Sequence, residues 1–417
     1  MTATAGRYRY LVLALLVLVY TINFVDRIML GILVPPIKAE LGLADTELGL
    51  LGGTAFALFY TALGIPLGWL ADRANRVWII TTALALWSAF TAACGLAQNF
   101  PQLFLARIGV GIGEAGGTAP SYSLLSDYFG PAERARALGI FSFGIPIGSA
   151  LGLVIGGTIA SAIDWRTAFL AVGVAGLVLA PFVRLAVREA PRGGLDSAAA
   201  LTAPPPLGTV VRLLFAKRSF WGLALGGGFS AMMGYGLLFW LPSFFMRSYG
   251  LTLVETSLYV GGITIVGSTS GIWLGGWLAD RFGTRNRAAY ALVPAGALLL
   301  STPFHVAGVL STSQFLSLLV LVIPIALSSA WVGPTLCAVQ HLVQPGMRAT
   351  GSALFLFVDN LIGIGLGSLV IGAISDGLSA RYGAESLRYA ILAGTVFYLL
   401  GAALFALTAR RLDRDWV

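Results

Sequence analysis

The chain has few charged residues and almost no cysteine or histidine. Asp, Glu, Lys and Arg make up 11% of its 417 residues, with 18 acidic side chains against 26 basic ones. A soluble globular domain carries about 25% charged residues, so this composition excludes a chain with a fully water-facing surface. The two cysteines, Cys94 and Cys337, lie inside long apolar runs and indicate neither a disulfide framework nor a metal site. We expect no metal and no cofactor.

Long apolar runs are what the sequence has in abundance, since 57% of its residues are hydrophobic. A transmembrane helix needs roughly 20 consecutive apolar residues. Runs of this kind lie at residues 9–35, 47–71, 77–97, 101–126, 137–161, 165–187, 219–246, 254–279, 288–308, 312–337, 350–374 and 387–410. The sequence therefore predicts an all-α membrane protein with twelve transmembrane helices.

The basic residues are distributed unevenly between the predicted loops. If the N-terminus is inside, 19 Lys and Arg residues fall on inner loops and helix ends, and 5 fall on outer ones. The positive-inside rule then predicts cytoplasmic N- and C-termini, in a cell membrane that we expect to be a bacterial inner membrane. No basic patch lies on a soluble face, so we expect no nucleic-acid partner. The expected partners are the lipid bilayer, protons and a small amphipathic substrate, bound by a functional monomer.

One segment interrupts the series of apolar runs. Residues 189–218 contain Pro191, the run Pro204-Pro205-Pro206 and the basic pair Lys217-Arg218. This composition predicts a cytoplasmic linker between an N-terminal half, 1–188, and a C-terminal half, 219–417. Within the linker, residues 210–215 form a short amphipathic stretch.

Two motifs recur half a chain apart. GWLADR occupies residues 68–73 and again 276–281, in each case at the end of the second helix of a half. The pattern P-x-x-R-A-x-x-x-x-x-F occupies residues 131–141 and 345–355, where the fifth helix of each half begins. Two parallel six-helix repeats are the architecture of major facilitator transporters.

The motifs themselves resemble this family. The signature G-x-L-A-D-R lies between the second and third helices, as in the major facilitator superfamily. Three further segments resemble its spinster branch of lysolipid and sphingosine-phosphate transporters: NFVDR at residues 23–27, RIGVGIGEA at 107–115 and IFSFGIPIGS at 140–149. The resemblance implies two pseudo-symmetric six-helix halves and transport by alternating access.

The repeated GWLADR loops are candidates for an inner gate. In the superfamily the acid of such a loop latches onto an opposing helix N-terminus, where the helix dipole favours an anion. The alternative is an ordinary positive-inside loop. The candidate gate residues are Gly68, Asp72, Arg73, Arg76, Asp280 and Arg281.

Two glycine stripes indicate close helix packing. Small residues four apart form a smooth stripe that lets helix backbones approach closely. Because the fifth and eighth helices of this superfamily face each other across the halves, we interpret the stripes as a gliding domain seam, with static packing as the alternative. The stripes are Gly144, Gly148, Gly152 and Gly156, then Gly267, Gly271 and Gly275, and Asp359 is a further polar candidate at this seam.

Four buried charges are the main functional candidates. Asp26 and Arg27 lie in the first helix, and Arg107 and Glu114 lie seven residues apart on one face of the fourth. Ionisable residues at membrane depth are costly and are functional hypotheses by default. Asp26 and then Glu114 are the candidate proton carriers, with Arg27 and Arg107 as their charge partners or as ligands of a substrate head group. The alternative is a purely structural ion-pair network.

The two halves offer different cavity walls. The N-terminal half is charged, whereas the seventh and tenth helices are aromatic and apolar, which suits a ligand with an anionic head and an apolar tail. The candidate cavity residues are Asn23, Ser142, Tyr235, Trp240, Ser329 and Trp331.

These patterns predict a proton-coupled secondary transporter, not an enzyme, for an amphipathic anion such as a lysolipid. The alternatives are an anion/proton symporter for a small organic acid, a multidrug/proton antiporter, and, in a different class, a non-transporting receptor or scramblase.

Overall fold

The structure is a computed structural model that describes residues 3–71, 73–191, 207–283, 285–344 and 347–417. None of these described residues lies in a β-strand. Ten segments of the described chain are long and apolar enough to cross a membrane, and one of them, Thr350–Asp415, contains two long helices. Together with the helix pair between residues 100 and 128, these segments form the predicted fold of twelve transmembrane helices.

The chain divides into two compact units. Unit 1 consists of Met1–Leu43 and Ala55–Thr202, and unit 2 consists of Ala44–Thr54 and Ala203–Val417. The division differs from the predicted halves chiefly at residues 44–54, which belong to unit 2 although they precede most of unit 1 in the sequence.

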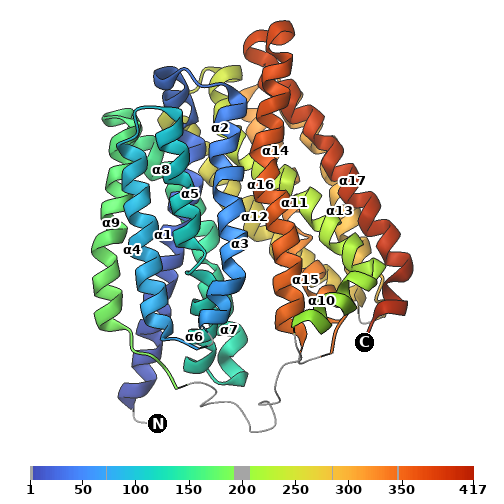
Figure 1. The fold of residues 1–417 in the computed structure, drawn as a ribbon. Coiled ribbons are helices and arrows are strands. Elements are labelled where there is room, and N and C mark those ends of the chain that lie inside the picture. Colours follow the sequence, from blue (N-terminus) through green and yellow to red (C-terminus); the bar gives the residue numbers. More distant parts are fainter. Residues whose placement is uncertain (1–2, 72, 192–206, 284, 345–346) are drawn as a thin grey trace. The chain divides into compact units, whose positions relative to one another are not determined.

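Unit 1 is built around α1 and α4. Helix α1 packs against α8 and α9, and α4 packs against α5 and α9 (Figure 1). The helices of this unit are α1 (Ala3–Leu41), α3 (Thr54–Ala71), α4 (Arg76–Gly95), α5 (Phe100–Glu114), α6 (Thr118–Tyr128), α7 (Pro131–Ser142), α8 (Gly144–Ala162) and α9 (Trp165–Ala186).

Unit 2 repeats this packing. Its first long helix, α11, packs against α16, as α1 packs against α8, and α13 packs against α14 and α17, as α4 packs against α5 and α9. Its helices are α2 (Asp45–Gly52), α10 (Leu207–Ala216), α11 (Arg218–Tyr249), α12 (Leu253–Gly283), α13 (Ala289–Leu310), α14 (Gln314–Ser329), α15 (Val332–Gln340), α16 (Arg348–Tyr382) and α17 (Ser386–Asp415), with the short 3₁₀ helix Gly383–Glu385 before α17.

Four transmembrane segments predicted as continuous helices are broken. The breaks separate α2 from α3, α5 from α6, α7 from α8 and α14 from α15. At the first break, a methyl group on Gly53 would lie 2.5 Å from the Ile364 carbonyl oxygen on α16. Glycine therefore permits a close backbone approach where the helix is interrupted. Breaks of this kind are tolerated at membrane depth only where the protein itself surrounds the backbone.

Residues 44–54 are tied to unit 2 by polar contacts. The two guanidinium nitrogens of Arg247 each donate to Asp45 at 2.7 Å, and the Ser375 hydroxyl donates to the same carboxylate at 2.7 Å. The Asp376 carboxylate accepts from the backbone N–H groups of Asp45 and Thr46, at 3.0 and 2.7 Å. Asp376 thereby satisfies the first N–H groups of α2, as an N-cap side chain does.

The second part of the predicted linker is also packed onto unit 2. The amphipathic stretch forms helix α10, with Val210 and Leu214 buried. After it, the Lys217 ammonium donates to the carbonyls of Leu342 and Asp415, both at 2.7 Å. Burial lowers the pKa of Lys217 from its ordinary value. Residues 207–218 are therefore part of the folded unit rather than a free linker.

The glycine stripes make the close contacts that their spacing predicts, but inside each unit. A methyl group on Gly152 would lie 2.6 Å from the Val25 carbonyl on α1, and Gly144, Gly148 and Gly156 also face α1. In unit 2, Gly267, Gly271 and Gly275 face α14, where a methyl group on Gly267 would lie 2.8 Å from Ile325. The gliding-seam interpretation is corrected on this point, because static packing within each unit covers these faces.

Candidate functional site: a charged cluster in unit 1

The four charges predicted from the sequence meet in unit 1. A guanidinium nitrogen of Arg27 lies 2.6 Å from the Glu114 carboxylate, and one of Arg107 lies 3.7 Å from the Asp26 carboxylate. Each charge on α1 is thus paired with the opposite charge on α5. The side chains of Asp26, Arg107 and Glu114 are at most 1% exposed, and that of Arg27 is 8% exposed.

Side chains that the sequence did not single out surround the cluster. Three aromatic rings enclose the Arg27 guanidinium: its carbon lies 4.8 Å from the ring centre of Phe24, 4.6 Å from Phe56 and 4.8 Å from Tyr60. A cation over an aromatic face is stabilised by the ring quadrupole. Phe24 lies within the NFVDR segment, but nothing in the local sequence marked Phe56 or Tyr60, which lie on α3.

Two polar neighbours complete the cluster. The Thr91 hydroxyl on α4 donates a hydrogen bond to the Asp26 carboxylate, and Asn23, which is 2% exposed, lies beside Glu114. Asn23, predicted as a cavity residue, therefore lies with the charged cluster. Thr91 was not identified from the sequence, because it lies in no recognisable motif. A threonine within an apolar run is nevertheless a candidate for a buried hydrogen-bond donor.

The pairing has an energetic consequence. Removing one partner of a buried ion pair typically destabilises a protein by about 3–5 kcal/mol, because the remaining charge is uncompensated. With all four groups ionised the cluster is neutral, so each acid and each arginine contributes to holding the others. Protonation of either acid therefore weakens an ion pair with an arginine.

The first residue of α4 forms a second ionic centre in unit 1. Arg76, predicted as part of a gate, is 1% exposed and pairs with Asp127 on α6 and with Glu189, whose carboxylate lies 2.6 Å away. Glu189 also accepts from the backbone N–H groups of Arg76 and Val77, at 2.7 and 3.2 Å, and so caps α4. Arg76 therefore fixes three segments of unit 1 to one another.

The other predicted gate residues that the structure describes have contacts of their own. The Arg73 guanidinium donates to the Trp69 carbonyl at 3.1 Å and lies over the Trp69 ring, and Gly68 approaches Ala119. In unit 2, Asp280 is exposed and Arg281 lies over the Trp277 ring. Asp72 lies outside the described residues.

The predicted cavity residues differ in exposure. Ser142 and Ser329 are half-buried and donate to carbonyls of their own helices, those of Leu138 and Ile325. Tyr235 is half-buried, whereas Trp331 is 7% exposed.

Trp240 requires a correction. Its side chain is fully buried, and its indole N–H donates to the Ser368 carbonyl on α16 at 2.8 Å. A residue whose single donor is satisfied in the core is a packing residue, so Trp240 does not line a cavity in this structure.

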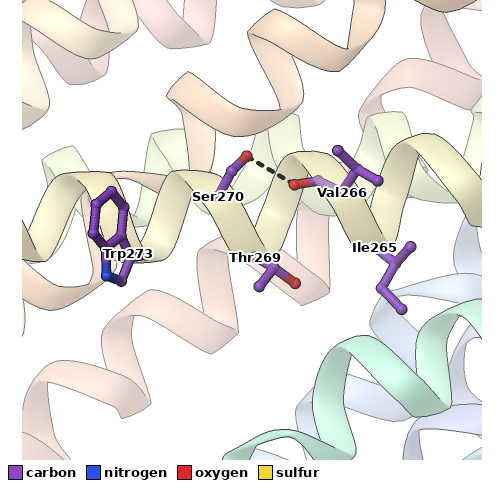
Figure 2. A pocket seen from close by; sticks show the side chains of 5 residues that line it. All are labelled: Ile265, Val266, Thr269, Ser270 and Trp273. Carbon is purple, nitrogen blue, oxygen red and sulfur yellow. Dashed lines mark hydrogen bonds between the residues drawn. The ribbon is translucent and has the colours of Figure 1, made fainter.

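An apolar hollow of about 440 Å³ lies on one face of α12 (Figure 2). Ser270 donates to the Val266 carbonyl of its own helix at 2.7 Å, so its hydroxyl is already satisfied. No ionisable side chain lines this hollow, and none of the predicted site residues does. Its lining residues are Ile265, Val266, Thr269, Ser270 and Trp273.

Comparison with known proteins is consistent with this organisation. Residues 16–368 match the family described as the Major Facilitator Superfamily. An MFS-type efflux pump of Mycolicibacterium smegmatis is 34% identical over 98% of this chain and 94% of the relative. Protein spinster homolog 1 of Homo sapiens is 30% identical over 97% of this chain and 81% of the relative.

A solved structure is similar over almost the whole chain. It is a crystal structure of a bacterial homologue of the human lysosomal transporter spinster, in an inward-facing and unoccupied conformation. It is 33% identical, covers 98% of each chain and has a TM-score of 0.88. These relatives are transporters rather than enzymes. The chain therefore belongs to the Major Facilitator Superfamily of membrane transporters and, within it, is related to the spinster proteins.

Proposed function

We propose that this transporter is proton-coupled and moves an amphipathic anion, such as a lysolipid or a sphingosine-phosphate-like molecule, by alternating access. The observation that carries the proposal is the almost completely buried cluster of two acids and two arginines in unit 1. Charges at membrane depth persist where they serve a pathway for ions or substrate. The resemblance to spinster proteins supports the same substrate class.

Asp26 is the better proton carrier of the two acids. Its ion pair with Arg107 is long, at 3.7 Å, whereas Glu114 and Arg27 are in direct contact at 2.6 Å. A charge-assisted hydrogen bond at normal length holds a carboxylate ionised more strongly than a distant charge does. Protonation of Asp26 therefore disrupts less of the cluster than protonation of Glu114.

Protonation also prepares the cluster for an anion. With one acid neutral, the cluster carries a net charge of +1, and an arginine becomes available to a phosphate or carboxylate head group. An arginine fork binds either group through two parallel hydrogen bonds. Proton binding and anion binding then favour each other, and we expect tighter substrate binding at lower pH.

The unit 2 side chains support an apolar tail. Tyr235 is half-buried and α11 around it carries no charged residue between Arg218 and Arg247. Burial of a hydrocarbon chain contributes about 0.8 kcal/mol per CH₂ group, so aromatic and apolar surface is sufficient for this part of the ligand.

The test is pH-driven flux into proteoliposomes. Asp26→Asn is expected to abolish the response of flux to a pH gradient, because the amide cannot carry the proton, and Glu114→Gln is expected to impair it similarly or less. Asp413→Asn is the matched control, since that carboxylate is 77% exposed. An unchanged pH response in the Asp26 variant would remove this residue from the mechanism.

Thr91→Val provides a variant that keeps all four charges. It removes the hydrogen bond that Thr91 donates to Asp26, which favours the ionised form of the acid. We expect the pH dependence of flux to move toward higher pH, with the cluster otherwise intact. A profile identical to that of the wild type would argue against Asp26 as the titrating group.

A drug/proton antiporter is the second candidate, favoured by the relative that is described as an efflux pump. A competition assay separates the two candidates. For the proposed function, a lysolipid-like anion should displace bound substrate, and substitution of Arg107 should weaken binding of that anion. Preferential binding of organic cations, unaffected by Arg27 or Arg107 substitution, would favour the antiporter.

We further propose cytoplasmic N- and C-termini in a bacterial inner membrane and a functional monomer.

A further inference from the structure

Asp359, in the middle of α16, is a buried acid of a different kind. Its side chain is 4% exposed, and its Oδ1 atom accepts no hydrogen bond from the described residues. No ion pair to Asp359 is present in the described part of the chain. The acids Asp26 and Glu114 of unit 1, by contrast, each lie beside an arginine.

Two aromatic rings lie near the carboxylate. A methyl group placed on Gly227 of α11 would lie 3.2 Å from Asp359 Oδ1, 3.0 Å from the Trp331 ring and 3.3 Å from the Phe355 ring. The two rings meet edge to face, with centres 6.4 Å apart. Because Gly227 has no side chain, the carboxyl group and both rings can approach the α11 backbone at this point, and none of these neighbours is a cation.

Charged groups on the surrounding elements lie near their ends. Along α16 itself, Arg348 is 11 residues before Asp359 and Asp376 is 17 residues after it, about 16 and 25 Å at a rise of about 1.5 Å per residue. Helix α15 has no charged residue. The charged residues of the other elements packed on α16 are Arg218 and Arg247 of α11, Arg388, Arg410, Arg411, Asp413, Arg414 and Asp415 of α17, Asp45 and Glu47 of α2, Arg212 of α10 and Glu385 of the 3₁₀ helix.

An ionised carboxylate in such surroundings is unstable unless a cation compensates it. A metal ion is a poor candidate, because the described residues contain no group of three or more acidic, histidine or cysteine side chains that could hold one, and hard cations require several oxygen ligands. We infer that Asp359 is a proton-binding site of unit 2, separate from the cluster in unit 1, and holds its proton at neutral pH.

The inference goes beyond the proposed function, because it requires neither a substrate nor flux. Infrared difference spectroscopy of the purified protein detects the carbonyl stretch of a protonated carboxylic acid directly. At neutral pH we expect this band in the wild type and a loss of band intensity, equal to one carboxyl group, in Asp359→Asn. The matched control, Asp413→Asn, should leave the band unchanged.

Thermal stability provides a second measurement. An amide closely matches the shape and charge of a protonated carboxyl group, so Asp359→Asn should unfold at the same temperature as the wild type at neutral pH. Loss of the band together with an unchanged unfolding temperature supports the assignment. A band of unchanged intensity in Asp359→Asn, or an absent band in the wild type, would overturn it.

A bound monovalent cation is the competing outcome. If sodium chloride stabilised the wild type more than choline chloride at fixed pH, and Asp359→Asn abolished the difference, Asp359 would bind a metal cation instead of a proton. Failure of pH-driven flux in proteoliposomes would contradict the proposed function and leave the infrared result standing.

Discussion

The ion pair between Asp45 and Arg247 gives a stability prediction whose size follows from burial. The Asp45 side chain is 3% exposed and that of Arg247 is 21% exposed. Arg247→Ala removes two charge-assisted hydrogen bonds from the buried Asp45 carboxylate, which keeps the hydrogen bond that the Ser375 hydroxyl donates. Breaking a buried ion pair in this way destabilises by about 3–5 kcal/mol. We expect the lower end, about 3 kcal/mol, because water reaches the vacated position.

Substitution of the other partner, Asp45, should destabilise the protein less. Asp45→Asn leaves Arg247 without its partner, but the guanidinium is partly exposed and water can solvate it. Loss of hydrogen bonds to a charged group that water can reach corresponds to about 1–2 kcal/mol. The double variant, Asp45→Asn with Arg247→Ala, removes both charges and should be more stable than Arg247→Ala alone. The asymmetry between the single variants is the specific expectation.

Thermal unfolding in detergent can be followed through a buried thiol. Cys94 is fully buried, so a thiol-reactive dye labels it only when the chain opens, and Cys337→Ser removes the half-buried second thiol. Because such unfolding is commonly irreversible, the variants are compared at one heating rate. The matched control is Arg287→Ala, since Arg287 and Asp413 form an exposed pair that contributes about 0–1 kcal/mol. The reasoning fails if Arg247→Ala is no less stable than this control or than Asp45→Asn.

Three further expectations concern packing and charge. Gly152→Ala should destabilise by about 1–3 kcal/mol through overpacking, since its methyl group would lie 2.6 Å from the Val25 carbonyl, whereas Gly262→Ala, which meets nothing within 4 Å, should have no effect in the same melting assay. Arg107→Lys should weaken binding of an anionic substrate in an equilibrium binding assay, because the charge stays but the fork geometry is lost. Asp280→Asn should remove about 0.3–1 kcal/mol of helix-dipole stabilisation from the proposed latch, and unchanged distances between spin labels on the inner loops would contradict that latch.

The helices could be predicted from the sequence, but their interruptions could not. Long apolar runs define membrane-crossing segments because the requirement is compositional. The break between α5 and α6 falls at residues 115–117, among glycines that would equally fit a continuous, closely packed helix. A methyl group on Gly117 would lie 3.3 Å from the Trp87 ring, so a neighbour far away in sequence decides how this segment packs.

The site shows the same limit. Charged residues in apolar runs identify Asp26, Arg27, Arg107 and Glu114 without a structure, because such residues are rare at membrane depth. Their partners depend on tertiary geometry: the long Arg27 side chain reaches Glu114 rather than pairing with the adjacent Asp26. The prediction for Trp240 fails for a related reason. The local sequence does not indicate whether an aromatic residue in a predicted lining helix faces the cavity or the core.

The two units keep one helix-packing scheme and carry different charges within it. Helix α1 packs on α8 as α11 packs on α16, yet α1 contributes two charges to a paired cluster while α11 contributes a glycine beside a lone acid. In the first arrangement an arginine lies beside each acid, so protonation must compete with an ion pair and can respond to a bound anion. In the second, no arginine competes, so the proton is held by burial alone. A repeated scaffold can therefore contain one proton site that is sensitive to substrate charge and another that is not.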